Sequence, residues 1–204
     1  MKFYPAMKIL IPAMVLDGFL LGFTTTNFST LLKAEDETNF NVGLLHISNG
    51  IGAIIGGYLS GFISTRIHVL KEGVMLFLYF ALSLLLTYFI KLVDFEGLAY
   101  PLFITFLWGI TLYALEGWLF VCCVKLFSGS MESFATVKQV HTLSFIIFQV
   151  YSLLSGQKVD FYLTITILLG ITIFQLIVCF VTSRKVQIVE LVEEESSGDD
   201  YPIN

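Results

Sequence analysis

The chain alternates between long apolar stretches and short polar connections. Six stretches each reach roughly the 20 residues that a helix needs to cross a bilayer. They cover Lys8–Leu32, Val42–Ser64, Gly73–Lys91, Leu98–Val124, Val137–Ser155 and Phe161–Thr182. Because lipid offers the backbone no hydrogen-bond partners, we expect each stretch to be an α-helix. A transmembrane β-barrel would show alternating polarity in segments of about 10 residues, whereas these runs are continuously apolar. The pattern predicts an all-α polytopic membrane protein with six transmembrane helices.

The composition supports this prediction and divides the chain into three parts. The sequence is 56% hydrophobic and 13% charged, which is unusual for a soluble protein. Residues 1–7 form a short basic lead, and residues 8–185 form the transmembrane domain. Residues 186–204 are rich in acidic residues, and such a segment cannot bury enough apolar surface to fold, so we expect a disordered tail. The first helix is expected to be a retained signal anchor. The alternative that the chain is a fragment of a longer protein stays open.

The placement of lysine and arginine predicts the orientation. The residues that would flank one side of the membrane outnumber those on the other side by eight to three. The larger group is Lys2, Lys8, Arg66, Lys71, Lys125, Lys138, Arg184 and Lys185, and the smaller is Lys33, Lys91 and Lys158. Positive charge favours the cytoplasmic side. Both termini are therefore predicted to face the cytoplasm, or the matrix if the membrane is organellar.

Two spans predict contrasting surroundings. The second span carries Gly52, Gly56, Gly57 and Gly61, which form overlapping small-xxx-small patterns. Such patterns let another helix approach closely, whether from this chain or from a partner. The third span is almost entirely aliphatic and aromatic, which predicts a peripheral helix that faces lipid.

The fifth span has a polar face that also predicts a contact. Its polar positions recur at steps of three and four residues, and this spacing places them on one side of a helix. The face consists of Lys138, His141, Thr142, Phe145, Gln149 and Ser152. We expect lipid around most of the chain, and on this face another membrane protein or a second copy of the chain.

The sequence argues against several classes of function. It contains no glycine-rich phosphate loop, no nucleophile elbow and no zinc-binding helix motif. Its three histidines and three cysteines do not have the spacing of metal ligands. We therefore expect no enzymatic activity, no cofactor and no metal site. The net charge of -5 argues against nucleic acid as a partner.

The connection between the second and third spans carries a recognisable pattern. Gly57-Tyr58-Leu59-Ser60-Gly61, followed by Arg66, resembles the loop signature of the major facilitator superfamily. Gly61 and Phe62 stand where that signature has an acidic residue and an arginine. The superfamily folds as two six-helix halves around a central cavity, and each half is a pair of inverted three-helix repeats. The resemblance implies that this chain is one such half.

Further motifs occur in the first, fourth and fifth spans. They are Ile11-Pro12, Gly18-Phe19, Gly22-Phe23 and Asn27-Phe28, then Phe106-Leu107-Trp108-Gly109, then Ser133-Phe134-Ala135 with Lys138 and Gln139. These motifs resemble the second half of the uncoordinated-type ion-channel-regulator proteins, a branch of the same superfamily. The match covers roughly residues 8–182. Leu20 and Asn27 stand where that branch usually has acidic residues.

Two acidic residues lie inside predicted spans, where ionisable groups cost at least ~2.5–3.5 kcal/mol on insertion scales. At ~1.5 Å per residue, Asp17 and Glu116 both lie about 12 Å inside the same boundary. The resemblance implies that the first and fourth helices line a cavity, so the two acids would share a polar pocket suited to a proton or cation. The alternative is that each is neutral and hydrogen-bonded to a nearby helix, or paired with Lys8 or Lys138.

Two hypotheses of function follow. The first is a non-catalytic membrane subunit or regulator that packs against a partner through the second and fifth spans. The second is a half-transporter that pairs with its own copy and moves a small solute or cation, with Asp17 and Glu116 as coupling acids.

Overall fold

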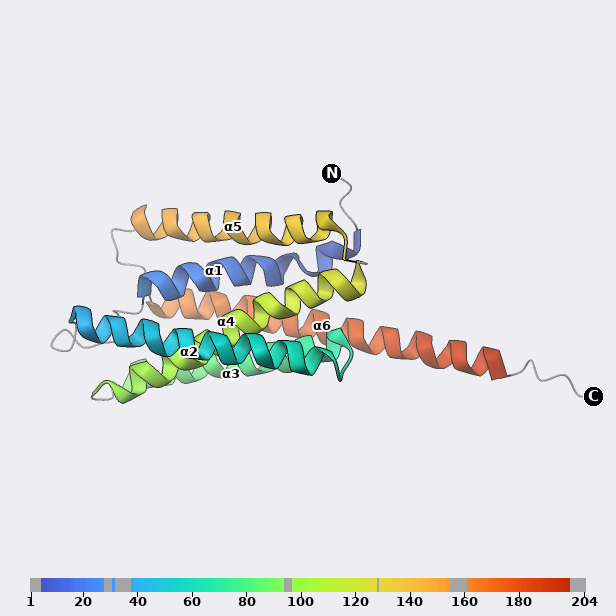
Figure 1. The fold of residues 1–204 in the computed structure, drawn as a ribbon, viewed down its shortest axis with the longest axis horizontal. Coiled ribbons are helices and arrows are strands. Elements are labelled where there is room, and N and C mark those ends of the chain that lie inside the picture. The colour runs from blue at the N-terminus through green and yellow to red at the C-terminus, as the bar shows by residue number, and fades with distance from the viewer. Residues whose placement is uncertain are drawn as a thin grey trace, which may run out of the picture.

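The computed structural model describes residues 5–27, 31, 38–93, 97–127, 129–154 and 161–198, and its regular structure over these ranges is entirely helical (Figure 1). Each predicted span overlaps one long helix, which confirms the all-α prediction. A short 3-10 helix, η1 (Pro5–Ile9), precedes the first of them. The long helices are α1 (Ile11–Asn27), α2 (Asn39–Ser64), α3 (Val69–Val93), α4 (Ala99–Leu126), α5 (Met131–Leu154) and α6 (Phe161–Gly198).

Four of these helices contain segments long and apolar enough to cross a membrane. The segments are Phe40–Ser64, Val69–Phe89, Ala99–Leu126 and Phe161–Arg184. In α1 the apolar segment Ile11–Thr26 is shorter. Helix α5 has 24 residues, but its many polar side chains keep it outside this group. The chain is thus an α-helical protein of membrane type, with spanning segments supported in four of its six long helices.

The helices pack in pairs that are distant in the sequence. Helix α2 lies along α4, α1 lies along α5, and α3 lies along α6. Figure 1 shows α5 at one edge of the bundle, with α1 between α5 and the remaining helices. The α1–α5 pair is parallel, because Asp17 and Thr25 contact His141 and Gln149, in the same order.

The core is built around two tryptophans of α4. The Trp108 indole donates to the Thr87 hydroxyl at 3.0 Å, and the Trp118 indole donates to the Val69 carbonyl at 2.7 Å. Phe23 packs against Trp108 with ring centroids 5.1 Å apart. Since lipid is as apolar as a leucine side chain, such close packing and hydrogen bonds hold membrane helices together.

Two predictions from the sequence can be compared with the helices. Helix α3 was expected to be peripheral and to face lipid; 50% of its apolar segment is buried, while Leu78, Leu82 and Phe89 are exposed. Its buried side packs against α4 and α6. Helix α6 continues to Gly198, past the predicted start of the tail at residue 186, because glutamate, leucine and glutamine favour helix. Residues 1–4 of the basic lead and residues 199–204 of the tail lie outside the described part.

Candidate functional site

The centre of the candidate site is a contact between Asp17 on α1 and His141 on α5. The His141 Nδ1 atom lies 2.6 Å from the Asp17 Oδ2 atom. The side chain of Asp17 is 2% exposed and that of His141 is 13% exposed. The second carboxylate oxygen, Asp17 Oδ1, is buried and has no hydrogen-bond partner among the described residues. The site therefore contains an ionisable pair with one unused acceptor atom.

Glycines on α1 allow this contact to form. A methyl group added at Gly18 would lie closer than 3.0 Å to the backbone of His141 and to the Ser144 side chain. One added at Gly22 would lie equally close to the Phe148 ring. Small residues at these positions let the backbones of α1 and α5 approach closely enough for short side chains to meet.

A second ionic contact lies beside the first. Lys138 on α5 forms an ion pair with Glu116 on α4, and its ammonium lies 5.0 Å from the centre of the Phe120 ring. Lys138 is one of the two bases that the sequence suggested as partners for the acids. The side chains of Lys138 and Glu116 are 51% and 25% exposed, so this pair faces the surface of the bundle.

The two pairs together form a polar cluster of Asp17, Glu116, Lys138 and His141 across α1, α4 and α5. Lys138 and His141 are one helical turn apart, so α5 holds both acids at neighbouring levels. Both Glu116 and Lys138 act electrostatically on Asp17. Farther along the same seam, Gln149 donates to the Thr25 hydroxyl at 3.1 Å. The cluster can hold or pass a proton, or bind a small cation at the unused Asp17 oxygen. The described residues contain no group of three side chains suited to a metal ion.

The glycines of α2 separate onto two faces. Methyl groups added at Gly52 or Gly56 would clash with the Phe106 or Ile110 carbonyl of α4. In the same way, a methyl group at Gly109 of α4 would clash with the Asn49 carbonyl. The first two glycines are thus used for packing inside the chain. By contrast, nothing lies within 4 Å of the positions where methyl groups would stand at Gly57 and Gly61.

Helix α5 presents an outward face that no described element covers. Its first turns expose Lys138, Gln139 and Thr142 on that face. Its later turns expose Ile146 and Val150, with exposed fractions of 50% and 49%. We call these five residues the α5 outward face. The predicted partner face is therefore divided, because His141 and Gln149 turn toward α1, while Lys138 stays at the surface.

Sequence reasoning missed two features of the site. It placed His141 on a partner face, whereas the structure pairs it with Asp17. Counted from the predicted span boundaries, His141 lies only about 6 Å deep at ~1.5 Å per residue, so depth gave no signal for this pair. It also began the third span at Gly73, which left Glu72 in a loop. In the structure Glu72 is 4% exposed and accepts a hydrogen bond from the Ser60 hydroxyl at 3.0 Å. Hydropathy gave no signal for this second buried acid, because it lies in the first turn of α3, before the apolar run begins.

In comparisons with models of protein families, with curated proteins and with solved structures, nothing matched this chain.

Proposed function

We propose that this chain is a non-catalytic membrane subunit or regulator, built on half of a major-facilitator-like fold, which packs against a partner membrane protein through α5. The observation that carries the proposal is the α5 outward face. Helix α5 is long enough to cross a bilayer, yet it exposes Lys138, Gln139 and Thr142. Polar side chains at membrane depth are found against protein or a water-filled cavity rather than against lipid. Lys138 already pairs with Glu116, so a second protein on this face would supply partners for Gln139 and Thr142.

The helix pairing supports the half-fold part of the proposal. In an inverted repeat of three helices, α1 corresponds to α4, α2 to α5 and α3 to α6. This exchange turns the observed pair α2–α4 into the observed pair α5–α1, and the contact α3–α4 into α6–α1. The α2–α4 pair is parallel, as α1–α5 is, because Ser48 and Asn49 donate to the Leu102 and Thr105 carbonyls in the same order.

The outward face of α2 that carries two glycines offers a second contact for the same partner. Gly57 and Gly61 are one turn apart and open to the surface. Gly56 cannot take part in such a contact, because α4 already covers it. A partner contact on α2 is therefore expected at Gly57 and Gly61.

A photoreactive side chain at Thr142 is expected to form a covalent adduct with the partner in native membranes. The matched control is the same side chain at Leu82 of α3, which is 58% exposed on an apolar surface. We expect an adduct of defined mass from position 142 and none from position 82, measured by denaturing gel and mass spectrometry. Equal labelling at both positions, or none at position 142, would contradict the proposal. An adduct of twice the chain mass would favour self-pairing.

A half-transporter is the second candidate, and the polar cluster favours it. Asp17 is buried with an unused oxygen, and Glu116 lies on the exposed edge of the same cluster. A carboxylate pair that changes its proton or cation occupancy could couple movement of a solute to a gradient.

In this case Glu116→Gln is expected to reduce rubidium uptake or proton entry into reconstituted vesicles at least tenfold. The reason is that the amide keeps the shape of the side chain but cannot carry the charge. Glu132→Gln is the matched control, since Glu132 is an exposed carboxylate at the start of α5. Flux that is equal in both variants and in the unchanged chain would remove the cluster from any transport role.

A further inference from the structure

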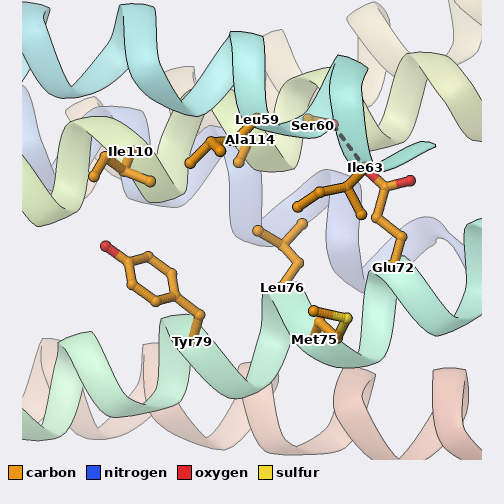
Figure 2. A pocket seen from close by; sticks show the side chains of 9 residues that line it. All are labelled: Leu59, Ser60, Ile63, Glu72, Met75, Leu76, Tyr79, Ile110 and Ala114. Carbon is orange, nitrogen blue, oxygen red and sulfur yellow. Dashed lines mark hydrogen bonds between the residues drawn. The ribbon is translucent and has the colours of Figure 1, made fainter. Parts of the chain in front are cut away.

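A pocket between α2, α3 and α4 opens on the outer surface of the bundle (Figure 2). Its volume is about 250 Å³, and apolar atoms form nearly all of its wall. Leu59 of α2 and Met75 of α3, which both line it, are 39% and 56% exposed, so the pocket is open between these two helices. It exists because α2 and α3 both pack on α4 but hardly touch each other.

The polar residues around the pocket do not make it a polar site. The Ser60 hydroxyl donates to Glu72 Oε1 at 3.0 Å, the dashed contact in Figure 2. Figure 2 also shows the second Glu72 oxygen turned away from the pocket and the Tyr79 hydroxyl turned toward α4. A molecule in the pocket would therefore meet hydrocarbon on all sides. Such a wall fits a hydrocarbon chain through many small van der Waals contacts.

The pocket has the depth of one leaflet of a bilayer. Its residues on α3 run from Glu72 to Tyr79, about 10 Å along the helix. They begin three residues after Val69, where the apolar segment of α3 starts. The hydrocarbon core of a bilayer is about 30 Å thick, which gives each leaflet about 15 Å. The pocket thus lies at the depth of acyl chains, and its end near Glu72 lies close to the level of lipid headgroups.

Basic side chains gather at this headgroup end. Arg66 is exposed in the connection between α2 and α3, and Lys71 is exposed in the first turn of α3, one turn before Met75. Lys125, at the end of α4, donates to the Ser64 carbonyl, which places its ammonium beside the same connection. The two ion pairs among the described residues, at α1–α5 and α4–α5, involve none of these three bases.

We propose that this pocket binds an anionic phospholipid, with one acyl chain between α2, α3 and α4 and the phosphate on Arg66 and Lys71. Phosphate oxygens accept charge-assisted hydrogen bonds from such bases, and these bonds are roughly twice as strong as neutral ones. Bases grouped directly beyond membrane helices are typical of sites for anionic lipids. Between residues 59 and 79 the sequence has a single acid, Glu72, so with Lys125 the headgroup end carries a net positive charge.

The pocket is separate from the surfaces proposed for a partner protein. Leu59 and Ile63 each follow one of the open glycines, Gly57 and Gly61, by two residues, which is about 200° around the axis of α2. The α5 outward face belongs to a helix that does not line the pocket. A lipid in the pocket therefore leaves both surfaces free for a partner.

The test uses the whole chain in nanodiscs of phosphatidylcholine that contain a small fraction of photoreactive lipid. The probes are phosphatidylglycerol and phosphatidylcholine with the same diazirine on one acyl chain, and mass spectrometry of peptides locates the label. One base near a membrane surface raises the affinity for an anionic lipid about fivefold. We therefore expect phosphatidylglycerol to label the pocket segments of α2, α3 and α4 at least fivefold more than phosphatidylcholine does.

Three variants distinguish a built site from general attraction to positive charge. Arg66→Gln with Lys71→Gln is expected to bring phosphatidylglycerol labelling of the pocket to within twofold of phosphatidylcholine labelling. The matched control, Lys8→Gln with Arg184→Gln, removes two exposed bases from η1 and α6, which do not line the pocket, and is expected to keep the fivefold preference. Ala114→Phe fills the pocket from α4 and is expected to lower labelling by both probes at least fivefold.

Thermal unfolding in the same nanodiscs checks that each variant is folded. Equal labelling of the pocket by the two probes in the unchanged chain, or labelling by neither, would overturn the proposal. The same would follow if the folded control variant lost the preference as fully as the variant at positions 66 and 71, or if folded Ala114→Phe were labelled as the unchanged chain is. None of these results depends on the adduct at Thr142, so this site and the proposed function can fail separately.

Discussion

Gly56→Ala is expected to destabilise the protein strongly, whereas Gly57→Ala, one residue away, is expected to leave it intact. The added methyl group at position 56 would meet the Ile110 backbone of α4 closer than 3.0 Å. A backbone cannot rotate away as a side chain can, so α2 and α4 must separate along their length. Overpacking a core costs ~1–3 kcal/mol, and a clash with backbone should reach about 3 kcal/mol or more. At Gly57 the methyl group meets no atom within 4 Å.

The measurement is reversible unfolding in lipid bicelles, with both variants compared with the unchanged chain. For Gly57→Ala the free energy of unfolding should stay within about 1 kcal/mol, the difference in helix propensity between glycine and alanine. Gly109→Ala on the opposite helix should behave like Gly56→Ala, since its methyl group would meet the Asn49 carbonyl. Similar stabilities for Gly56→Ala and Gly57→Ala would show that α2 and α4 do not pack as described.

The glycine pattern shows how far the sequence could lead. The spacing of Gly52, Gly56, Gly57 and Gly61 predicted close approach of a helix, and α4 approaches at the first two. The two pairs differ by about 100° around the helix axis, so one helix cannot cover both closely. Spacing alone does not say which pair faces the chain, because that depends on the rotation of α2 against α4, a property of tertiary packing.

Side-chain partners were harder to predict than helices. Counting residues placed Asp17 and Glu116 at similar depth, and the structure brings both to α5. The identity of each partner depends on the register between α1, α4 and α5, which the glycines at 18 and 22 help to set. Glu72 escaped notice because helix α3 begins at Val69, four residues before the apolar run that marked the span. Polar residues at the end of a helix carry no hydropathy signal that would include them.

The polar residues along one side of α5 do not all face a partner. His141 and Lys138 lie on one side of α5 by spacing, yet His141 packs against α1 with its side chain 13% exposed and Lys138 is 51% exposed. A polar stripe in a membrane helix can therefore serve an internal contact and an external one at the same time. The internal part must be identified first, because its loss would unfold the protein and would be mistaken for loss of a partner.

The second large effect is expected at the Asp17–His141 pair. His141→Phe removes the donor and leaves both oxygens of a buried carboxyl group without a partner, because Asp17 Oδ1 already has none. Removing one member of a buried ionic pair costs ~3–5 kcal/mol, whereas hydrogen bonds between membrane helices average ~0.6 kcal/mol in double-mutant cycles. We expect a loss of about 3 kcal/mol in the free energy of unfolding for His141→Phe. Asp17→Leu should cost less, since it leaves a neutral imidazole behind.

The double variant Asp17→Leu with His141→Phe distinguishes a packing role of the Asp17–His141 pair from a role in transport. With both polar groups replaced by apolar ones, the double variant should be more stable than His141→Phe by about 2 kcal/mol or more in the free energy of unfolding, measured in the same bicelles. The coupling energy of the pair is the difference between the effect of the double variant and the sum of the two single effects. A coupling energy near ~0.6 kcal/mol would instead mean an ordinary interhelical hydrogen bond. A stable double variant then separates the two functions. If the folded double variant still forms the adduct at Thr142 and any cation flux is unchanged, the pair serves only to hold α1 against α5. If cation flux is present in the unchanged chain but lost in this variant, the pair belongs to a transport site.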